Sequence, residues 1–213
     1  MSAALALPTF GAAPTSVSDR LGTLRNVTAL AELGFRPQLI KRITSAQRPE
    51  IMAIVERVGG ITKDPGGRQP HSVANLIESL DRHIASSLFL RHYISMLHLW
   101  EAGKTVLHQD AFLRAVYVYR SEVGESEARK EIFTPDHMFL VANLFHEDKV
   151  TLCRCGVCQS QYLTSSVAQV VGQHVTTGDC PVCRELMSIH KGRPISRLPD
   201  PKEQKRIVRE LIS

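Results

Sequence analysis

Two pairs of cysteines in the C-terminal part constrain this chain more than any other feature. The first pair is Cys155 and Cys158, the second is Cys180 and Cys183, and residues 159–179 separate them. Two Cys-x-x-Cys units at about this separation are a specific metal signal, because each short spacer lets the backbone fold around an ion with both sulfurs pointing inward. Four thiolates suit tetrahedral zinc and leave no coordination position for a substrate. The sequence therefore predicts one structural Zn²⁺ per chain, and a binding protein before an enzyme.

Other uses of the cysteines are less well supported. Cys153 also precedes the first pair, but a Cys-x-Cys spacing fits a closed tetrahedral site poorly, so we expect Cys153 to be a spare thiol. Disulfides and a thioredoxin-like redox pair remain alternatives; a reducing cytosol disfavours the former, and the lack of a βαβ pattern disfavours the latter. His174 could replace one thiolate.

No catalytic motif accompanies the cysteines. A zinc deaminase needs H-x-E and P-C-x-x-C, whereas Asp179 precedes the second pair and H-x-E does not occur. H-E-x-x-H, a Walker-type glycine loop and G-x-S-x-G do not occur either. We therefore expect a protein that is not an enzyme.

Positive charge is concentrated after the second cysteine pair. The formal net charge is +5, and residues 184–213 carry eight Lys or Arg against four acids, a difference of +4. A basic stretch fits a nucleic-acid partner without requiring one. The residues that we expect to contact DNA phosphates are Arg154, Arg184, Lys191, Arg193, Arg197, Lys202, Lys205 and Arg206.

Apolar residues at helical spacing predict a mainly α fold. The expected helices cover residues 17–34, a hairpin within 36–60, 72–101 with a bend near Ala85–Ser87, 110–123 and 134–145. The hairpin turns at Ser45–Arg48 and resembles a helix-turn-helix. Two interpretations stay open: a DNA-binding motif, or a packing hairpin whose Lys41, Arg42, Arg48 and Arg57 are only solvated.

The apolar pattern changes from helical spacing to short β-prone runs at Val150. Short β-prone runs at 161–164 and 169–176 lie between the cysteine pairs, which we expect to form tight turns of a zinc ribbon. A short helix is predicted over 201–211. The expected organisation is a disordered tail (1–16), a helical body with a partner-docking surface (17–149), a zinc-binding subdomain (150–190) and a basic C-terminal tail (191–213). The sequence contains no run of eighteen apolar residues, so it predicts no membrane-spanning helix.

Four segments together resemble the FlhC family, the zinc-containing subunit of the bacterial flagellar master transcriptional activator. They are LIKRITSAQRPEIMAIVERVGG, QPHSVANLIESLDRHIASSLFLRHYISML, AFLRAVYVYRSEV and FLVANLFHEDKVTLCRCGVCQSQYLT, the last completed by CPVC. Tyr162 follows Cys158 by four residues, as in the family. The resemblance covers roughly residues 17 to 190; the tail before Val17 is long for the family, and the region after Cys183 matches weakly.

The resemblance implies a cytoplasmic, DNA-binding transcription activator. It implies a heterohexamer of four small helical FlhD-like subunits and two of this chain, acting on double-stranded DNA and RNA polymerase. Its zinc ligands map onto Cys155, Cys158, Cys180 and Cys183. Related activators also occur on conjugative mobile elements, so flagellar and mobile-element promoters are both open. The alternative function is a zinc-ribbon protein-interaction module that does not touch DNA.

Overall fold

A computed structural model describes residues 17–62, 70–100, 106–124, 132–165, 180–191 and 199–212. The predicted tail over 1–16, the predicted strand over 169–176, and His174, Arg193 and Arg197 lie outside these residues. The predicted fold class is confirmed, since helices dominate and a small strand pair lies beside four clustered cysteines. In the described ranges, no helix is both long and apolar enough to cross a membrane.

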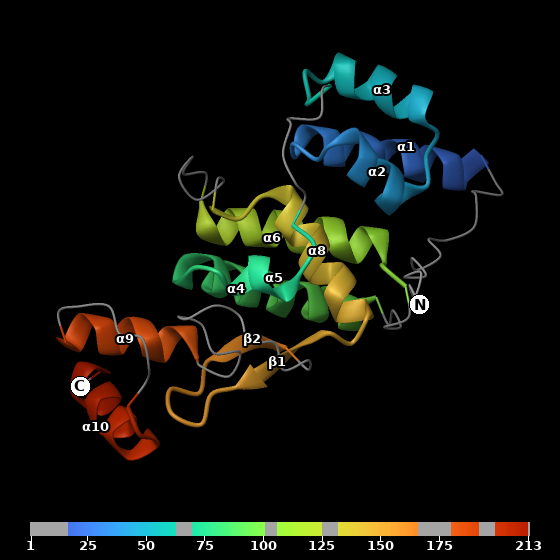
Figure 1. Ribbon diagram of the computed structural model, residues 1–213. Helices are drawn as coiled ribbons and strands as arrows, with labels where there is room; N and C mark the ends of the chain where they lie inside the picture. Colours follow the sequence, from blue (N-terminus) through green and yellow to red (C-terminus); the bar gives the residue numbers. More distant parts are fainter. Residues whose placement is uncertain are drawn as a thin grey trace, which may run out of the picture.

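Three N-terminal helices form a unit at one end of the molecule (Figure 1). They are α1 (Val17–Glu32), α2 (Pro37–Thr44) and α3 (Arg48–Arg57), and each packs against the other two. Leu30, Ile40 and Ile51 are fully buried where they meet. The hairpin turn is short because Ser45 takes a left-handed conformation with φ 56° directly after α2. Gln47 and Glu50 then form a capping box at the start of α3.

The centre of the molecule is built around α5 (Leu80–Leu99). It packs against α6 (Gln109–Val123), α8 (Pro135–His146) and the short α4 (Val73–Ile77). Phe89 and Tyr93 of α5 are fully buried and meet Phe112 of α6 edge to face, at ring-centroid distances of 5.9 and 6.1 Å. These aromatic contacts fix α5 as the core helix on which the C-terminal elements rest.

The predicted bend at Ala85–Ser87 is wrong, because the break lies earlier, between α4 and α5. Ser79 starts α5 there: its Oγ accepts a hydrogen bond from the backbone N–H of Arg82, 3.2 Å away. Ser87 instead lies within the helix, and its Oγ donates to the carbonyl of His83 at 2.7 Å. A serine can satisfy its hydroxyl this way without ending a helix.

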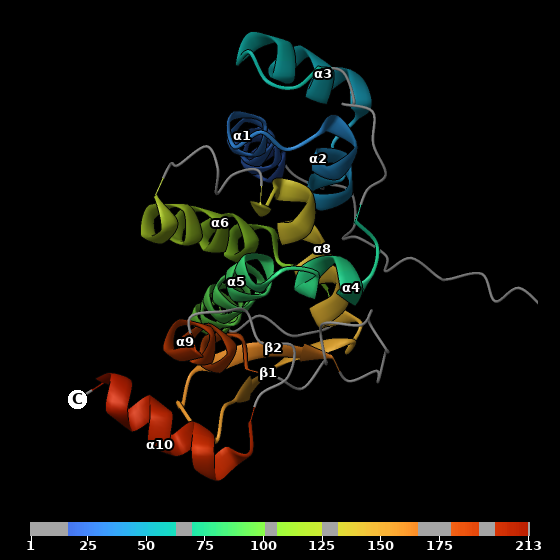
Figure 2. The same ribbon diagram turned by 60° about the vertical axis from the view of Figure 1, so that its left-hand side comes forward.

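The C-terminal elements gather at the other end of the molecule in both views (Figures 1 and 2). Strands β1 (Val150–Arg154) and β2 (Gln161–Ser165) pair antiparallel, with Leu152 opposite Leu163. Helices α9 (Pro181–Lys191) and α10 (Pro201–Ile212) follow and pack on each other, and α9 also contacts α5. The helix predicted over 201–211 is confirmed.

Candidate metal centre

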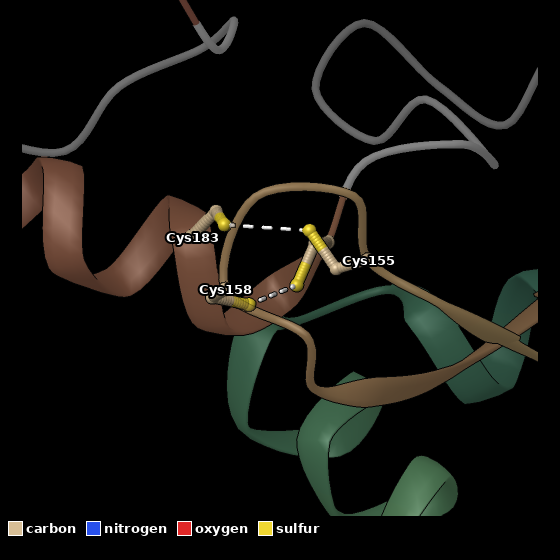
Figure 3. Close-up of side chains that lie close together, drawn as sticks. Cys155, Cys158 and Cys183 are labelled. Carbon is tan, nitrogen blue, oxygen red and sulfur yellow. Dashed lines mark hydrogen bonds between the residues drawn. The ribbon is translucent and has the colours of Figure 1, made fainter. Parts of the chain in front are cut away.

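The first cysteine pair lies in the turn of the β1–β2 hairpin. Cys155 directly follows β1, where its N–H donates to the Ser160 carbonyl at 2.9 Å and its carbonyl accepts from Gln159 at 3.1 Å. The backbone N–H of Val157 points at the Cys155 sulfur, 3.4 Å away. These bonds curl the chain so that the sulfurs of Cys155 and Cys158 face the same point (Figure 3). The turn expected from the spacing is therefore present.

The second pair does not form the tight turn that we expected, since it opens a helix. The carbonyl of Cys180 accepts from the backbone N–H of Arg184, 3.1 Å away, and α9 begins at the next residue, Pro181. Proline is favoured in the first turn of a helix because its missing N–H would have no intrahelical partner. Cys183 then lies one helical turn beyond Cys180 and faces the same side. The positive end of the helix dipole lies beside the Cys180 sulfur and favours its thiolate form.

All four sulfur atoms lie within 4.8 Å of one another. The Sγ atoms of Cys155 and Cys183 are 3.7 Å apart, and those of Cys158 and Cys180 are 3.6 Å apart (Figure 3). Zinc–sulfur bonds of about 2.3 Å at tetrahedral angles place neighbouring sulfurs about 3.8 Å apart. The cluster therefore has the size and the donor set of a closed Cys₄ zinc site.

Hydrogen bonding and burial shift the pKa values of the clustered cysteines in opposite directions. The pKa of Cys180 is lowered to about 5, chiefly because its sulfur accepts a hydrogen bond from Cys183. The same bond raises the pKa of Cys183, with burial adding to it, and burial raises the pKa of Cys158. These pKa shifts favour the thiolate form of Cys180 and the thiol form of Cys158 and Cys183. Binding of Zn²⁺ must therefore release protons.

Cys153 does not belong to the cluster. It lies on β1, half-buried, in register with Tyr162 of β2. Side chains alternate between the two faces of a strand, so Cys153 points opposite to its neighbour Leu152, which packs on the main core. The Cys-x-Cys spacing predicted that Cys153 would be a spare thiol, and its position on β1 agrees with that prediction.

Helix α10 packs against the first cysteine pair. Ile207 of α10 and Met187 of α9 are buried together, and Val157 and Cys158 of the hairpin turn pack against them. The start of α10 is capped by Asp200, whose carboxylate accepts from the backbone N–H groups of Lys202 and Glu203 at 2.8 and 3.2 Å. The segment expected as a basic tail is therefore, over 201–212, a folded helix seated on the candidate metal site.

A pair of side chains on α5 holds the hairpin to the helical body. His83 Nε2 donates to the carbonyl of Leu163 at 2.7 Å, and Ser87 Oγ accepts from the N–H of Leu163 at 2.9 Å. Leu163 is fully buried, and on the side of β2 away from β1 the described residues supply no further strand, so its backbone groups need these bonds. We call His83 and Ser87 the hairpin clamp. His83 could not be singled out from a motif in the sequence; two polar residues four apart on one face of α5 were the available signal.

The structure gathers the described residues of the predicted DNA-contacting set near the cysteine cluster. Arg154 ends β1, Arg184 and Lys191 lie on α9, and three cations lie on α10. Arg184 is half-buried, and the others are exposed: Arg154, Lys191, Lys202, Lys205 and Arg206. Figure 2 shows the hairpin, α9 and α10 together at one end of the molecule. These elements form a basic end, which consists of these six cations.

Comparison with known proteins gives one clear result. A family model described as "Flagellar transcriptional activator (FlhC)" matches residues 13–193 of the 213-residue chain. The match spans the three-helix unit, the core around α5, the hairpin and α9. No curated protein is similar enough in sequence to count as a match.

Proposed function

Because the chain belongs to the FlhC family of flagellar transcriptional activators, we propose that it is the DNA-binding, zinc-stabilised subunit of such an activator. The observation that carries the proposal is the packing of α10 on the cysteine cluster, which places exposed cations beside a Cys₄ site of zinc dimensions. A structural metal ion would then fix the surface that meets DNA. The protein would work in the cytoplasm on flagellar or mobile-element promoters.

The ligands of the zinc ion would be Cys155, Cys158, Cys180 and Cys183. Two of the sulfurs come from the turn between β1 and β2, and the other two come from the start of α9. A metal ion would therefore join two separate elements of the chain. Zinc bound by four thiolates supplies folding free energy and no reactive position. This is consistent with a transcription factor that does not act as an enzyme.

Phosphate contacts would come from the basic end. Lys202, Lys205 and Arg206 are exposed on α10, whereas Ile207 on the same helix is buried against α9. The helix therefore presents its cations away from the core. Each neutralised phosphate changes the slope of log Kobs against log[salt] by about 0.9. Three such contacts account for a slope of about −2.7.

A partner subunit would dock on the helical body. Leu21 of α1 is 64% exposed, Tyr117 of α6 is 45% exposed, and Trp100 after α5 is 40% exposed. Trp100 and Tyr117 line a groove between α1 and α6. We assign this face, where exposed Leu21, Trp100 and Tyr117 lie among polar side chains, to an FlhD-like helical subunit. The assembly would hold four such subunits and two of this chain, and would contact RNA polymerase.

The test compares DNA affinity across salt concentrations for the unmodified chain and for a variant with Lys202→Gln, Lys205→Gln and Arg206→Gln. The matched control is Arg91→Gln, an exposed helical cation on α5, outside the basic end. We expect the triple variant to lose about 2.7 from the slope and the control to lose none. An unchanged slope in the triple variant would favour the second candidate, a protein-interaction module without DNA contact, which the exposed side chains of Leu21, Trp100 and Tyr117 support.

A further inference from the structure

The end of the molecule opposite the basic end carries its own unpaired cations. Lys41 and Arg42 lie in the last turn of α2, and Arg48 and Arg57 lie at the two ends of α3. All four are exposed, and no ion pair joins any of them to a carboxylate of the described residues. Several other arginines of the body are paired, such as Arg36 with Asp136 at 3.1 Å and Arg82 with Glu78. Glu50 is already paired with Arg20, so the four cations outnumber Glu56, the other carboxylate of these two helices, and such a patch favours an anionic partner.

The layout of α2 and α3 favours double-stranded DNA as the anionic partner. Helix α2 has eight residues, α3 has ten, and three residues join them, which is the layout of a helix-turn-helix. Ser45 supplies the left-handed residue that lets so short a turn reverse the chain. The buried residues Ile51 and Val55 hold α3 on α1 and α2, and both views show its opposite face uncovered at the outer edge of the molecule (Figures 1 and 2).

The cations of α3 lie at its two ends. Arg48 and Arg57 are nine residues apart, which is about 14 Å along the helix axis. The major groove admits an α-helix, and a helix lying in it can therefore contact phosphates at two points along its length. Ala53 lies midway on the exposed face, where its small side chain allows close approach to base edges. Glu56 shares that face and could accept a hydrogen bond from the amino group of cytosine.

We propose that α2 and α3 form a second DNA-contacting surface, with α3 entering the major groove. The proposal rests on the proposed function, since it assumes a DNA-binding chain, but it uses residues at the other end of the molecule. Arg48 and Arg57, with Lys41 and Arg42 beside the turn, contact phosphates, and the face around Ala53 meets the bases. A chain with contacts at both ends would engage a longer stretch of DNA than the basic end alone.

The experiment measures binding of a labelled mixed-sequence duplex by the intact zinc-loaded chain, alone and with its partner subunit. The test variant carries Arg48→Gln and Arg57→Gln, both at exposed positions. The control is again Arg91→Gln, and the comparison is the triple α10 variant. A photo-crosslinking residue at position 53 reports what α3 faces. We expect the test variant to lose about 1.8 from the salt slope, and the residue at 53 to crosslink to DNA.

The outcomes separate this inference from the proposed function. If the α10 variant lowers the slope and the α3 variant does not, the basic end binds DNA and the inference about α3 is wrong. If the residue at 53 crosslinks to the partner subunit and never to DNA, α3 is a protein-docking face and the inference is again wrong. If the unmodified chain binds no duplex in either state, both the inference and the proposed function fail.

Discussion

The hairpin clamp gives a sharp prediction about stability. Ser87→Ala removes the hydroxyl that accepts from the N–H of Leu163 at 2.9 Å and donates to the carbonyl of His83 at 2.7 Å. The N–H of Leu163 then lies buried without an acceptor, because Leu163 is fully buried and β2 pairs with no strand other than β1 among the described residues. Leaving a buried donor unsatisfied costs about 1–3 kcal/mol. We expect the free energy of unfolding to fall by about 2 kcal/mol.

The chain offers a matched control for this change. Ser95 lies two turns further along α5, is exposed, and donates in the same way to the carbonyl of Arg91 at 3.0 Å. Because Ser95 is exposed, Ser95→Ala should change stability by less than about 0.5 kcal/mol. Both variants remove a serine hydroxyl that donates to a carbonyl four residues earlier, but only Ser87 is buried and bonded to Leu163.

Two measurements on the zinc-loaded protein check the prediction. Urea unfolding gives the loss of stability, and amide hydrogen exchange gives the protection of the Leu163 N–H. We expect Ser87→Ala to shift the midpoint and to speed exchange at Leu163 specifically. The reasoning is refuted if Ser87→Ala and Ser95→Ala have the same stability and the same exchange at Leu163.

Three further predictions concern other parts of the molecule. Arg36→Met should destabilise the fold by about 3 kcal/mol in urea unfolding, because it leaves the mostly buried carboxylate of Asp136 without its ion-pair partner; a loss below about 1 kcal/mol would contradict this. Burial lowers the pKa of His137 to about 4 from an ordinary 6.5, so the unfolded chain binds more protons between these values and stability should decline as pH falls from about 6.5 to about 4. His137→Gln keeps a side chain suited to the capping box of α8 and should reduce that decline. If the variant and the unmodified chain lose the same stability between about pH 6.5 and about pH 4, the prediction is wrong. Cys153→Ser should retain zinc after dialysis while Cys158→Ser loses it; equal retention would remove Cys158 from the ligand set.

Much of the fold follows from local sequence signals. The helices at 110–123 and 134–145 could be predicted because apolar spacing, a Thr-Pro start and clear ends all agree, and the structure has them at Gln109–Val123 and Pro135–His146. The proximity of the four cysteines was also predictable, because the Cys-x-x-Cys spacing fixes which sulfurs can meet.

Other features depend on contacts between distant segments. The bend was misplaced because Ser79, Ser86 and Ser87 look alike in sequence, and only packing decides that Ser79 caps a helix while Ser87 binds Leu163, 76 residues away. The second cysteine pair was expected in a turn, although Pro181 favours a helix start, because the zinc-ribbon pattern took precedence over local chemistry. The seating of α10 on the cysteine cluster could not be foreseen, since it depends on Met187 and Ile207 meeting the hairpin turn.

The most direct test of the account follows zinc and DNA binding together. Purified intact chain, with its partner subunit, is assayed for metal content and for duplex binding before and after a thiol-reactive agent and a chelator remove the metal. The account predicts one zinc ion per chain, and DNA binding that falls in proportion to the zinc lost and returns when Zn²⁺ is restored. Full DNA binding by a metal-free preparation would contradict it.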